Sequence, residues 1–342
     1  MVQVLYDLVS LWKATKEQQL YEAHAVKPEM LRLKEDTTMD LVVGATGILG
    51  AEIAQRLAAA GRPLAALVRP TSDATKLARL RTRGITLVHG DLKERRSLDA
   101  CCRGMSTVIS TASSTFSRQP GDSIATVDHQ GQLSLIEAAR VAGVQHFIFV
   151  SFPPAAEDFA LQRAKRAVEQ KLQESGLAYT ILQPTFFTEI WLSPAVGFDF
   201  SNARARIYGS GSNKISWISY LDVAAYAVAS VENPAARDAI IKLGGPEALS
   251  PLEVVKIFEE VGGREFAVEH VPEDALRAQK TQTKDALEEA FAALMLYYAK
   301  GEVIDNREAN RFFPSVAGKL ASVREYAKRV LSVSTPGEQA HG

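Results

Sequence analysis

The segment LVVGATGILG, residues 41–50, decides the fold of this chain. Three apolar residues run directly into Gly44, and Gly47 and Gly50 follow at intervals of three residues. A short apolar run that ends at a glycine indicates a buried strand followed by a turn. The question is why this turn carries three glycines.

The residues after the turn predict a helix. Leu49, Ile53 and Leu57 are spaced four apart and fall on one helical face. Gly61 stands where a helix C-terminus takes a left-handed residue, and Pro63 prevents the helix from continuing. A glycine turn between a strand and a helix lets a phosphate approach backbone N–H groups at the positive end of the helix. The alternative is a tight turn whose glycines serve close packing alone.

The next strand favours a dinucleotide as the ligand. LAALV, residues 64–68, is apolar, and Arg69 follows it directly. At this position an acidic residue binds the ribose 2′-hydroxyl of NAD, whereas an arginine suits the 2′-phosphate of NADP. Thr71, Ser72 and Lys76 offer further donors. We therefore expect NADP(H) as the cofactor, with a solvated charge at the strand end as the alternative for Arg69.

Strands and helices alternate along the rest of the first half. Expected strands cover residues 85–92, 107–113, 146–151 and 179–184, and expected helices cover 93–103, 129–142 and 159–175. This alternation predicts an α/β fold with a doubly wound parallel sheet, in which ligands bind at the carboxyl ends of the strands. The residues at those ends form one predicted rim: Gly44 to Gly50, Arg69, Asp91, Thr111, Ala112 and Ser151.

The pattern divides the chain into four parts. Residues 1–38 predict an amphipathic helical extension, 39–184 a Rossmann domain that binds NAD(P), 185–332 a smaller α+β substrate subdomain that returns some elements to the Rossmann core, and 333–342 a loose tail. Within the subdomain we expect helices at 222–232 capped by Asp222, 250–263 capped by Ser250, 284–301 and 322–331, and a strand at 240–245.

Composition excludes several classes of protein. The chain has 342 residues, 46% of them hydrophobic, and a net charge of −1, so neither nucleic acid nor an anionic membrane is expected as a partner. Cys101 and Cys102 are too few for a disulfide framework, and the six histidines show no metal-binding spacing. No apolar run is long enough for a transmembrane helix, and the N-terminus lacks the layout of a signal peptide. We expect a cytoplasmic protein without a metal site.

Several stretches carry a resemblance to a known family. GATGILG, LVRPTSD, GDL, STAS, AARVAGVQHFIFVS and KRAVEQKLQESGLAYTILQPTFFTE together resemble the NmrA-like group of atypical short-chain dehydrogenases. That group includes isoflavone reductases, phenylcoumaran benzylic ether reductases, NADPH-quinone reductases and inert redox-sensing regulators. The resemblance covers about residues 39–330 and implies a Rossmann fold that binds NADP(H).

The resemblance also implies roles for individual residues. It assigns to the pyrophosphate Gly44, Thr46, Gly47, Ile48 and Gly50, to the 2′-phosphate Arg69, and to the adenine Asp91 and Leu92. It assigns to the nicotinamide Thr111, Ala112, Ser151 and Phe152, and to the closure over the cofactor and the start of the substrate pocket Pro184 and Phe187 in the run PTFFTE. Lys165 stands where the ether reductases keep their catalytic lysine, and it is also counted among the cofactor-binding residues because its ammonium could orient a ribose hydroxyl.

The chain departs from the pattern of the families it resembles in two places. Ordinary short-chain dehydrogenases use Tyr-x-x-x-Lys, but Leu161 stands four residues before Lys165. The loop after the fifth strand reads SFPPAAED, residues 151–158, where the ether reductases have Ser-Glu-Phe-Gly, which predicts a different pocket wall. Lys165 remains the first catalytic candidate because a partly desolvated lysine can act as an acid or base. The alternative is a surface lysine among charged helical neighbours.

Other side chains are weaker candidates. Asp128 is expected to cap a helix and His129 to lie in its first turn, with a substrate role as the alternative. Tyr220 is expected in the core, with a position facing the pocket as the alternative. Four aromatic residues follow the sixth strand and suit either a planar substrate or core packing: Phe186, Phe187, Trp191 and Phe198.

The sequence thus predicts an NADPH-dependent reductase that transfers a hydride to a planar organic substrate of the quinone, enone or aromatic ether type. Two non-catalytic alternatives stay open, an NADP(H)-binding redox sensor or regulator and an assembly factor of the same family. The expected partner is a small molecule, and a homodimer is left open.

Overall fold

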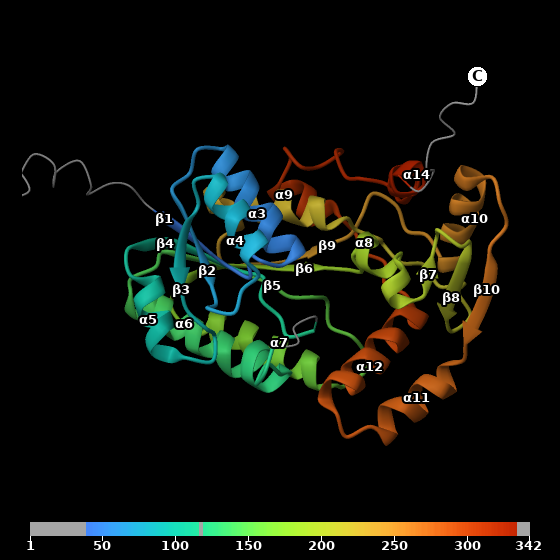
Figure 1. The fold of residues 1–342 in the computed structure, drawn as a ribbon, viewed down its shortest axis with the longest axis horizontal. Coiled ribbons are helices and arrows are strands. Elements are labelled where there is room, and N and C mark those ends of the chain that lie inside the picture. The colour runs from blue at the N-terminus through green and yellow to red at the C-terminus, as the bar shows by residue number, and fades with distance from the viewer. Residues whose placement is uncertain (1–38, 116–118, 334–342) are drawn as a thin grey trace, which may run out of the picture. The chain divides into compact units, whose positions relative to one another are not determined.

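The computed structural model describes residues 39–115 and 119–333 (Figure 1). The helical extension predicted over residues 1–38 lies outside the described residues. The tail predicted over 333–342 also lies outside them, apart from Val333 at the end of a helix.

A seven-stranded parallel sheet forms the centre of the described chain. Its strands lie in the order β3-β2-β1-β4-β5-β6-β9. Their bounds are Met39–Val43 for β1, Leu64–Val68 for β2, Thr86–His89 for β3, Met105–Ser110 for β4, His146–Val150 for β5, Ala178–Pro184 for β6 and Ala239–Leu243 for β9. The strand order reverses between β1 and β4, which opens a crevice at their carboxyl ends. This is the doubly wound α/β fold that the alternation predicts.

Helices cover both faces of the sheet (Figure 1). One face carries α3 (Ile48–Ala59), α4 (Ala74–Thr82), α9 (Tyr220–Glu232) and α13 (Arg307–Phe312), and the other carries α5 (Arg95–Cys102), α6 (Gln132–Val141) and α7 (Ala160–Gln173). Leu49, Ile53 and Leu57 of α3 are buried against the sheet, as their spacing predicts. The apolar stripe of α3 therefore fixes the glycine turn at the end of β1.

A smaller part of the chain packs around a second sheet. Its strands lie in the order β10-β8-β7 and span Ala267–Val271, Arg204–Tyr208 and Phe198–Asp199, respectively. Around them lie α8 (Thr188–Trp191), α10 (Pro251–Gly262), α11 (Glu273–Gln282), α12 (Ala286–Lys300) and α14 (Val323–Val333), with a short 3₁₀ turn at Pro194–Val196. A second 3₁₀ turn, Pro234–Ala236, follows α9 and buries Ala236 in the core of the large sheet. Strand β9 and helix α9 come from the same half of the sequence but belong to the large sheet and its cover.

Two of the three predicted helix caps are wrong. The helix expected to begin at residue 129 starts as a π-helix, Ile124–Gly131, and Ser123 forms its capping box, so Asp128 is not a cap. Helix α9 is capped by Ser219 and not by Asp222, which lies in the first turn and accepts a hydrogen bond from the Ala321 backbone at 2.9 Å. Ser250 does cap α10, in a reciprocal box with Glu253. Neither aspartate caps a helix, and each carboxylate makes another contact instead: Asp128 with Lys165, and Asp222 with the Ala321 backbone.

None of the helices in residues 39–115 and 119–333 is both long and apolar enough to cross a lipid bilayer. Over the same ranges, no group of three or more His, Cys, Asp or Glu side chains is arranged to hold a metal ion. Cys101 and Cys102 are buried and not joined in a disulfide.

Candidate active site

A cavity of about 760 Å³ opens where the strand order reverses. Residues from the ends of β1, β2, β4, β5 and β6 line it, because the carboxyl ends of parallel strands meet at one edge of the sheet. Every residue that the sequence assigned to the dinucleotide lies on its wall: Gly44, Thr46, Gly47, Ile48, Gly50, Arg69, Asp91, Leu92, Thr111, Ala112, Ser151, Phe152, Lys165, Pro184 and Phe187. Their roles toward a ligand stay predictions.

A different physical constraint accounts for glycine at each of the three positions in the turn. Gly44 has a φ of +93°, and a Cβ there would lie 2.6 Å from Thr111 Oγ1. At Gly50 a Cβ would lie 2.3 Å from the Gly44 carbonyl oxygen, so only glycine lets α3 pack this closely on the turn. Gly47 begins α3 with a φ of −84° and has only that carbonyl near its absent Cβ, at 3.3 Å. Close packing therefore explains two glycines, and approach of a ligand is left to explain the third.

The end of the helix at this turn suits an anion. Helix α3 has no acidic residue in its first turn and no side chain that caps its N–H groups. Unsatisfied N–H groups and the positive end of the helix dipole favour phosphate. Lys76 Nζ lies beside the turn and donates to the Thr46 carbonyl at 3.0 Å.

The far end of the cavity carries a chain of alternating charges. Arg69 Nη1 lies 2.6 Å from Asp122 Oδ2, and Lys93 Nζ lies 2.5 Å from the other oxygen of the same carboxylate. Lys93 also contacts Asp91 Oδ2 at 3.0 Å. The Ser72 hydroxyl accepts from the Arg69 backbone at 3.0 Å and thereby shapes the turn after β2. Arg69, the residue predicted to bind a 2′-phosphate, is therefore already paired with the carboxylate of Asp122.

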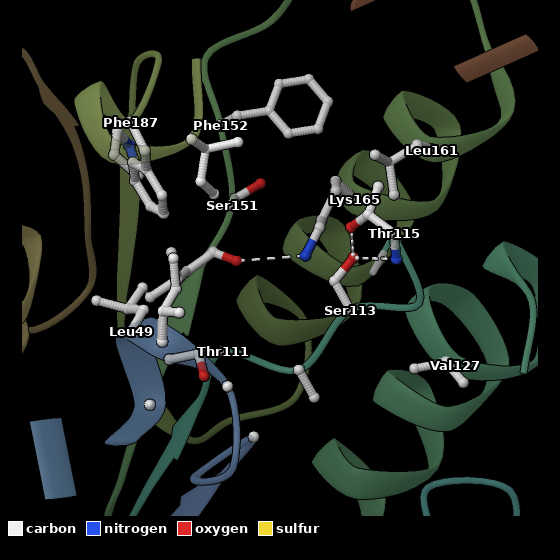
Figure 2. Close-up of a pocket in the computed structure, with 18 of the residues that line it drawn as sticks. Leu49, Thr111, Ser113, Thr115, Val127, Ser151, Phe152, Leu161, Lys165 and Phe187 are labelled. Carbon is white, nitrogen blue, oxygen red and sulfur yellow. Dashed lines mark hydrogen bonds between the residues drawn. The ribbon is translucent and has the colours of Figure 1, made fainter. Parts of the chain in front are cut away.

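Lys165 lies on the opposite side of the cavity and is buried, with 6% of its surface exposed. Its ammonium donates to the Val150 carbonyl at 3.4 Å, as the dashed line in Figure 2 marks, and lies 4.8 Å from the ring centre of Phe149. The alternative of a solvated surface lysine is therefore excluded. Burial lowers the pKa of this ammonium, whereas the nearby Asp128 and Glu169 carboxylates raise it.

Asp128 supplies the charge that balances this lysine. Its side chain is fully buried in the π-helix, with Oδ1 4.0 Å from Lys165 Nζ. Ser114 donates to Oδ2 from both its backbone N–H, at 2.9 Å, and its hydroxyl, at 2.6 Å. Oδ1 has no hydrogen-bond partner among the described residues. The carboxylate is thus held from one side and offers its other oxygen to the ammonium.

The residues next to Lys165 hold the loop that follows β5. Arg166 donates to the Ser151 hydroxyl at 2.9 Å and to the Phe152 carbonyl at 2.5 Å, and its guanidinium lies 5.5 Å from the Phe152 ring centre. Glu169 lies 2.9 Å from the same guanidinium. Helix α7 therefore carries both the candidate acid and the anchor of the loop after β5.

The part of the cavity beyond Lys165 is apolar and aromatic. It is lined by Phe186, Phe187, Ile190 and Trp191 near α8 and by Phe291, Leu294, Met295 and Tyr297 of α12. Of the predicted aromatic cluster only Phe198 lies elsewhere, packed 4.8 Å from Phe258 in the core of the smaller part. Tyr220 packs against the core of the large sheet, as expected, and His129 does not line the cavity.

Sequence reasoning missed several residues of the wall. The Ser113 and Thr115 hydroxyls lie 2.6 Å apart beside Lys165 (Figure 2). Leu161 lies one turn before Lys165 on the cavity, at the position of the missing tyrosine. One feature of the sequence indicated that α12 contributes to the wall. Its apolar residues cover more of the helix surface than packing against a single neighbouring element would require. Asp122 had no such feature, since it lies in a loop of ordinary polar composition.

Comparison with known proteins agrees with this geometry. The model of the NmrA-like family matches residues 37–327. An NAD(P)H azoreductase of Xenophilus azovorans is 33% identical over 302 residues, which cover 85% of this chain and 97% of the azoreductase. The photosystem II assembly factor Ycf39 of Synechocystis is 30% identical over 249 residues, covering 71% of this chain and 74% of that protein. The NADPH complex of an Escherichia coli NADPH-dependent quinone oxidoreductase shares the fold, with a TM-score of 0.69 and 21% identity over 85% of this chain and 99% of that one.

Proposed function

The chain belongs to the NmrA-like family, and from this premise we propose that it is an NAD(P)H-dependent reductase of a planar organic substrate. The observation that carries the proposal is a buried lysine on the same cavity as a glycine turn suited to a pyrophosphate. The azoreductase relative, which matches over nearly its full length, supports reduction as the activity.

The residues of the cavity fit a dinucleotide. In the proposal, the N–H groups at Gly47 and Ile48 hold the pyrophosphate, Arg69 and Lys76 meet the 2′-phosphate, and the ends of β4 and β5 flank the nicotinamide. When bound, a reduced nicotinamide supplies a hydride. Gln132 supports this wall, since it accepts from the Ser110 hydroxyl at 2.8 Å and donates to the Ala112 carbonyl at 3.1 Å.

Lys165 is the proposed proton donor. A substrate atom that gains negative charge as hydride arrives is stabilised by a nearby ammonium, which can then give up its proton. Burial lowers the pKa of Lys165 and so makes the proton easier to donate, while Asp128 keeps the ammonium charged before the reaction. No tyrosine is needed at position 161 in this scheme.

The lining favours a neutral aromatic substrate. Side chains of α8 and α12 form apolar walls that suit a planar ring. Glu189 also reaches the wall, but its carboxylate is engaged by the Ser219 hydroxyl at 2.5 Å, the Tyr220 N–H at 3.1 Å and Arg329 at 3.1 Å. Quinones, aromatic enones, azo compounds and benzylic ethers share the required shape.

The test is oxidation of NADPH, followed by its absorbance, with one member of each of these four substrate classes. We expect turnover with at least one class. The variant Lys165→Met should bind NADPH as the parent does and lose about 10²- to 10⁴-fold in kcat. Lys171→Met, on the same helix but away from the cavity, is the matched control and should leave kcat unchanged. Unaltered kcat in Lys165→Met would remove the lysine from the mechanism.

A non-catalytic role has two observations in its favour. Leu161 takes the place of the usual tyrosine, and relatives of this chain include a photosystem II assembly factor. Tight NADPH binding without turnover on any of the four classes would favour a redox sensor or an assembly factor over the reductase.

Location and assembly remain part of the proposal. We place the protein in the cytoplasm because its two cysteines are buried thiols, which suits a reducing compartment. A homodimer stays a prediction, and light scattering of the purified full chain would measure it.

A further inference from the structure

We propose that Asp122 sets the cofactor preference of this chain. In this inference, which rests on the proposed dinucleotide function, the Asp122 carboxylate competes with the 2′-phosphate of NADP(H) for Arg69. It therefore narrows the preference for NADPH over NADH that the arginine alone would give.

The geometry puts Asp122 against the same guanidinium that a 2′-phosphate would contact. Both Arg69 and Asp122 line the cavity, and their side chains meet at 2.6 Å. The Asp122 side chain is 1% exposed, whereas that of Arg69 is 27% exposed. The carboxylate thus lies beneath the guanidinium, and a ligand phosphate approaches the same cation from the open side. Two anions then share one arginine.

Contacts independent of Arg69 hold Asp122 in position. The Thr71 hydroxyl donates to Gln119 Oε1 at 2.6 Å, which ties the segment before Asp122 to the turn after Arg69. On the other side, the Thr126 hydroxyl donates to the Gly121 carbonyl at 2.7 Å, and Ser123 caps the π-helix. Asp122 cannot simply swing away when a phosphate arrives, because its backbone is fixed at both neighbours.

Two neighbouring cations, Lys93 and Lys76, are engaged by groups other than Asp122. Lys93 bridges Asp122 and Asp91, so one lysine is shared between two carboxylates. Lys76 donates to the Thr46 carbonyl at the glycine turn. A 2′-phosphate carries close to two negative charges at neutral pH, while the ribose 2′-hydroxyl of NADH carries none. The repulsion from Asp122 therefore acts on NADPH and spares NADH.

The experiment measures the dissociation constants of NADPH and NADH by fluorescence titration of the full chain. In Asp122→Asn, which keeps the size of the side chain, we expect the ratio of the NADH constant to the NADPH constant to rise about five- to tenfold. Asp122→Ser is the second variant in case the amide disturbs folding, and the rise should recur there. Asp99→Asn, which removes an exposed carboxylate 2.8 Å from Arg95, is the matched control and should leave the ratio unchanged.

Each outcome decides the inference. A ratio that falls in both Asp122 variants would show that the carboxylate instead holds Arg69 ready for the phosphate, and would overturn the proposal. An unchanged ratio would overturn it as well. If the parent chain binds neither dinucleotide, the proposed function itself fails and this inference falls with it.

Discussion

The pairing of Lys165 with Asp128 can be measured as a coupling energy. The two charges are 4.0 Å apart, and both side chains are buried. Unit charges at this distance attract by about 4 kcal/mol at an effective dielectric constant of about 20. We therefore expect a coupling of about 1–4 kcal/mol in the free energy of unfolding between the substitutions Lys165→Met and Asp128→Asn.

The single variants should differ in a predictable way. Lys165→Met leaves a buried carboxylate without its cation, which costs about 3–5 kcal/mol. Asp128→Asn costs less, because burial already lowers the pKa of Lys165 and the lysine can lose its proton. The double variant removes both charges and should be more stable than Lys165→Met alone.

The assay is urea unfolding of all four proteins at pH 7, read by tryptophan fluorescence. The control cycle uses Arg95→Met and Asp99→Asn, an exposed pair 2.8 Å apart whose coupling should be only about 0.3–0.5 kcal/mol. A Lys165–Asp128 coupling no larger than that of the control pair would refute the buried ion pair.

The variant Asp128→Asn should also change the pH dependence of kcat. If protonated Lys165 is the acid, kcat falls as pH rises through its pKa. Asp128 raises that pKa, so Asp128→Asn should move the falling limb of the kcat profile to lower pH. A limb that stays in place would mean that another group donates the proton.

Three further predictions concern the glycine turn and the first turn of α9. Gly50→Ala, whose Cβ would lie 2.3 Å from a carbonyl oxygen, should lower the unfolding free energy by about 1–3 kcal/mol in a thermal melt. Gly47→Ala, with 3.3 Å available, should fold like the parent yet bind NADPH about tenfold or more weakly in a fluorescence titration, and parental affinity would contradict the assignment of the pyrophosphate. Burial raises the pKa of Asp222 to about 6, above its unfolded value of 3.8, so its ionisation destabilises the fold as pH rises from about 4 to 6. Asp222→Asn should therefore be more stable than the parent at pH 7, by about 1–3 kcal/mol, and lose this advantage below pH 4; a difference independent of pH would rule out the titration of this carboxylate as the cause.

The sequence predicts the rim of the cavity well because strand ends are local signals. Once the strands are known to be parallel, Gly44, Arg69, Thr111 and Ser151 must meet at one edge. The caps were harder, since Ser123 and Asp128 are equally good capping residues and only the π-helical start decides between them. Lys165 is buried because it packs against β5. The sequence does not indicate this contact, since the neighbouring residues on its helix are charged and are typical of an exposed face.

The site residues that sequence reasoning missed were missed for one shared physical reason. Asp122 and the wall of α12 reach the cavity from segments distant in sequence, so no local pattern places them there. The apolar residues of α12 predict burial but not the object against which they are buried. Tertiary contact, and not propensity, brings these groups to the site.

The position of β9 has a consequence for how the chain is made. Strand β6 pairs on one side with β5 and on the other with β9, whose residues leave the ribosome only after those between 184 and 239. At about 5–20 residues per second, that interval lasts roughly 3–11 seconds. During it, a nascent Rossmann half exposes one apolar strand edge that is open to pairing with another chain. A fragment ending at residue 184 should therefore aggregate during expression, because β9, which pairs with the open edge of β6, comes from the later segment of the chain.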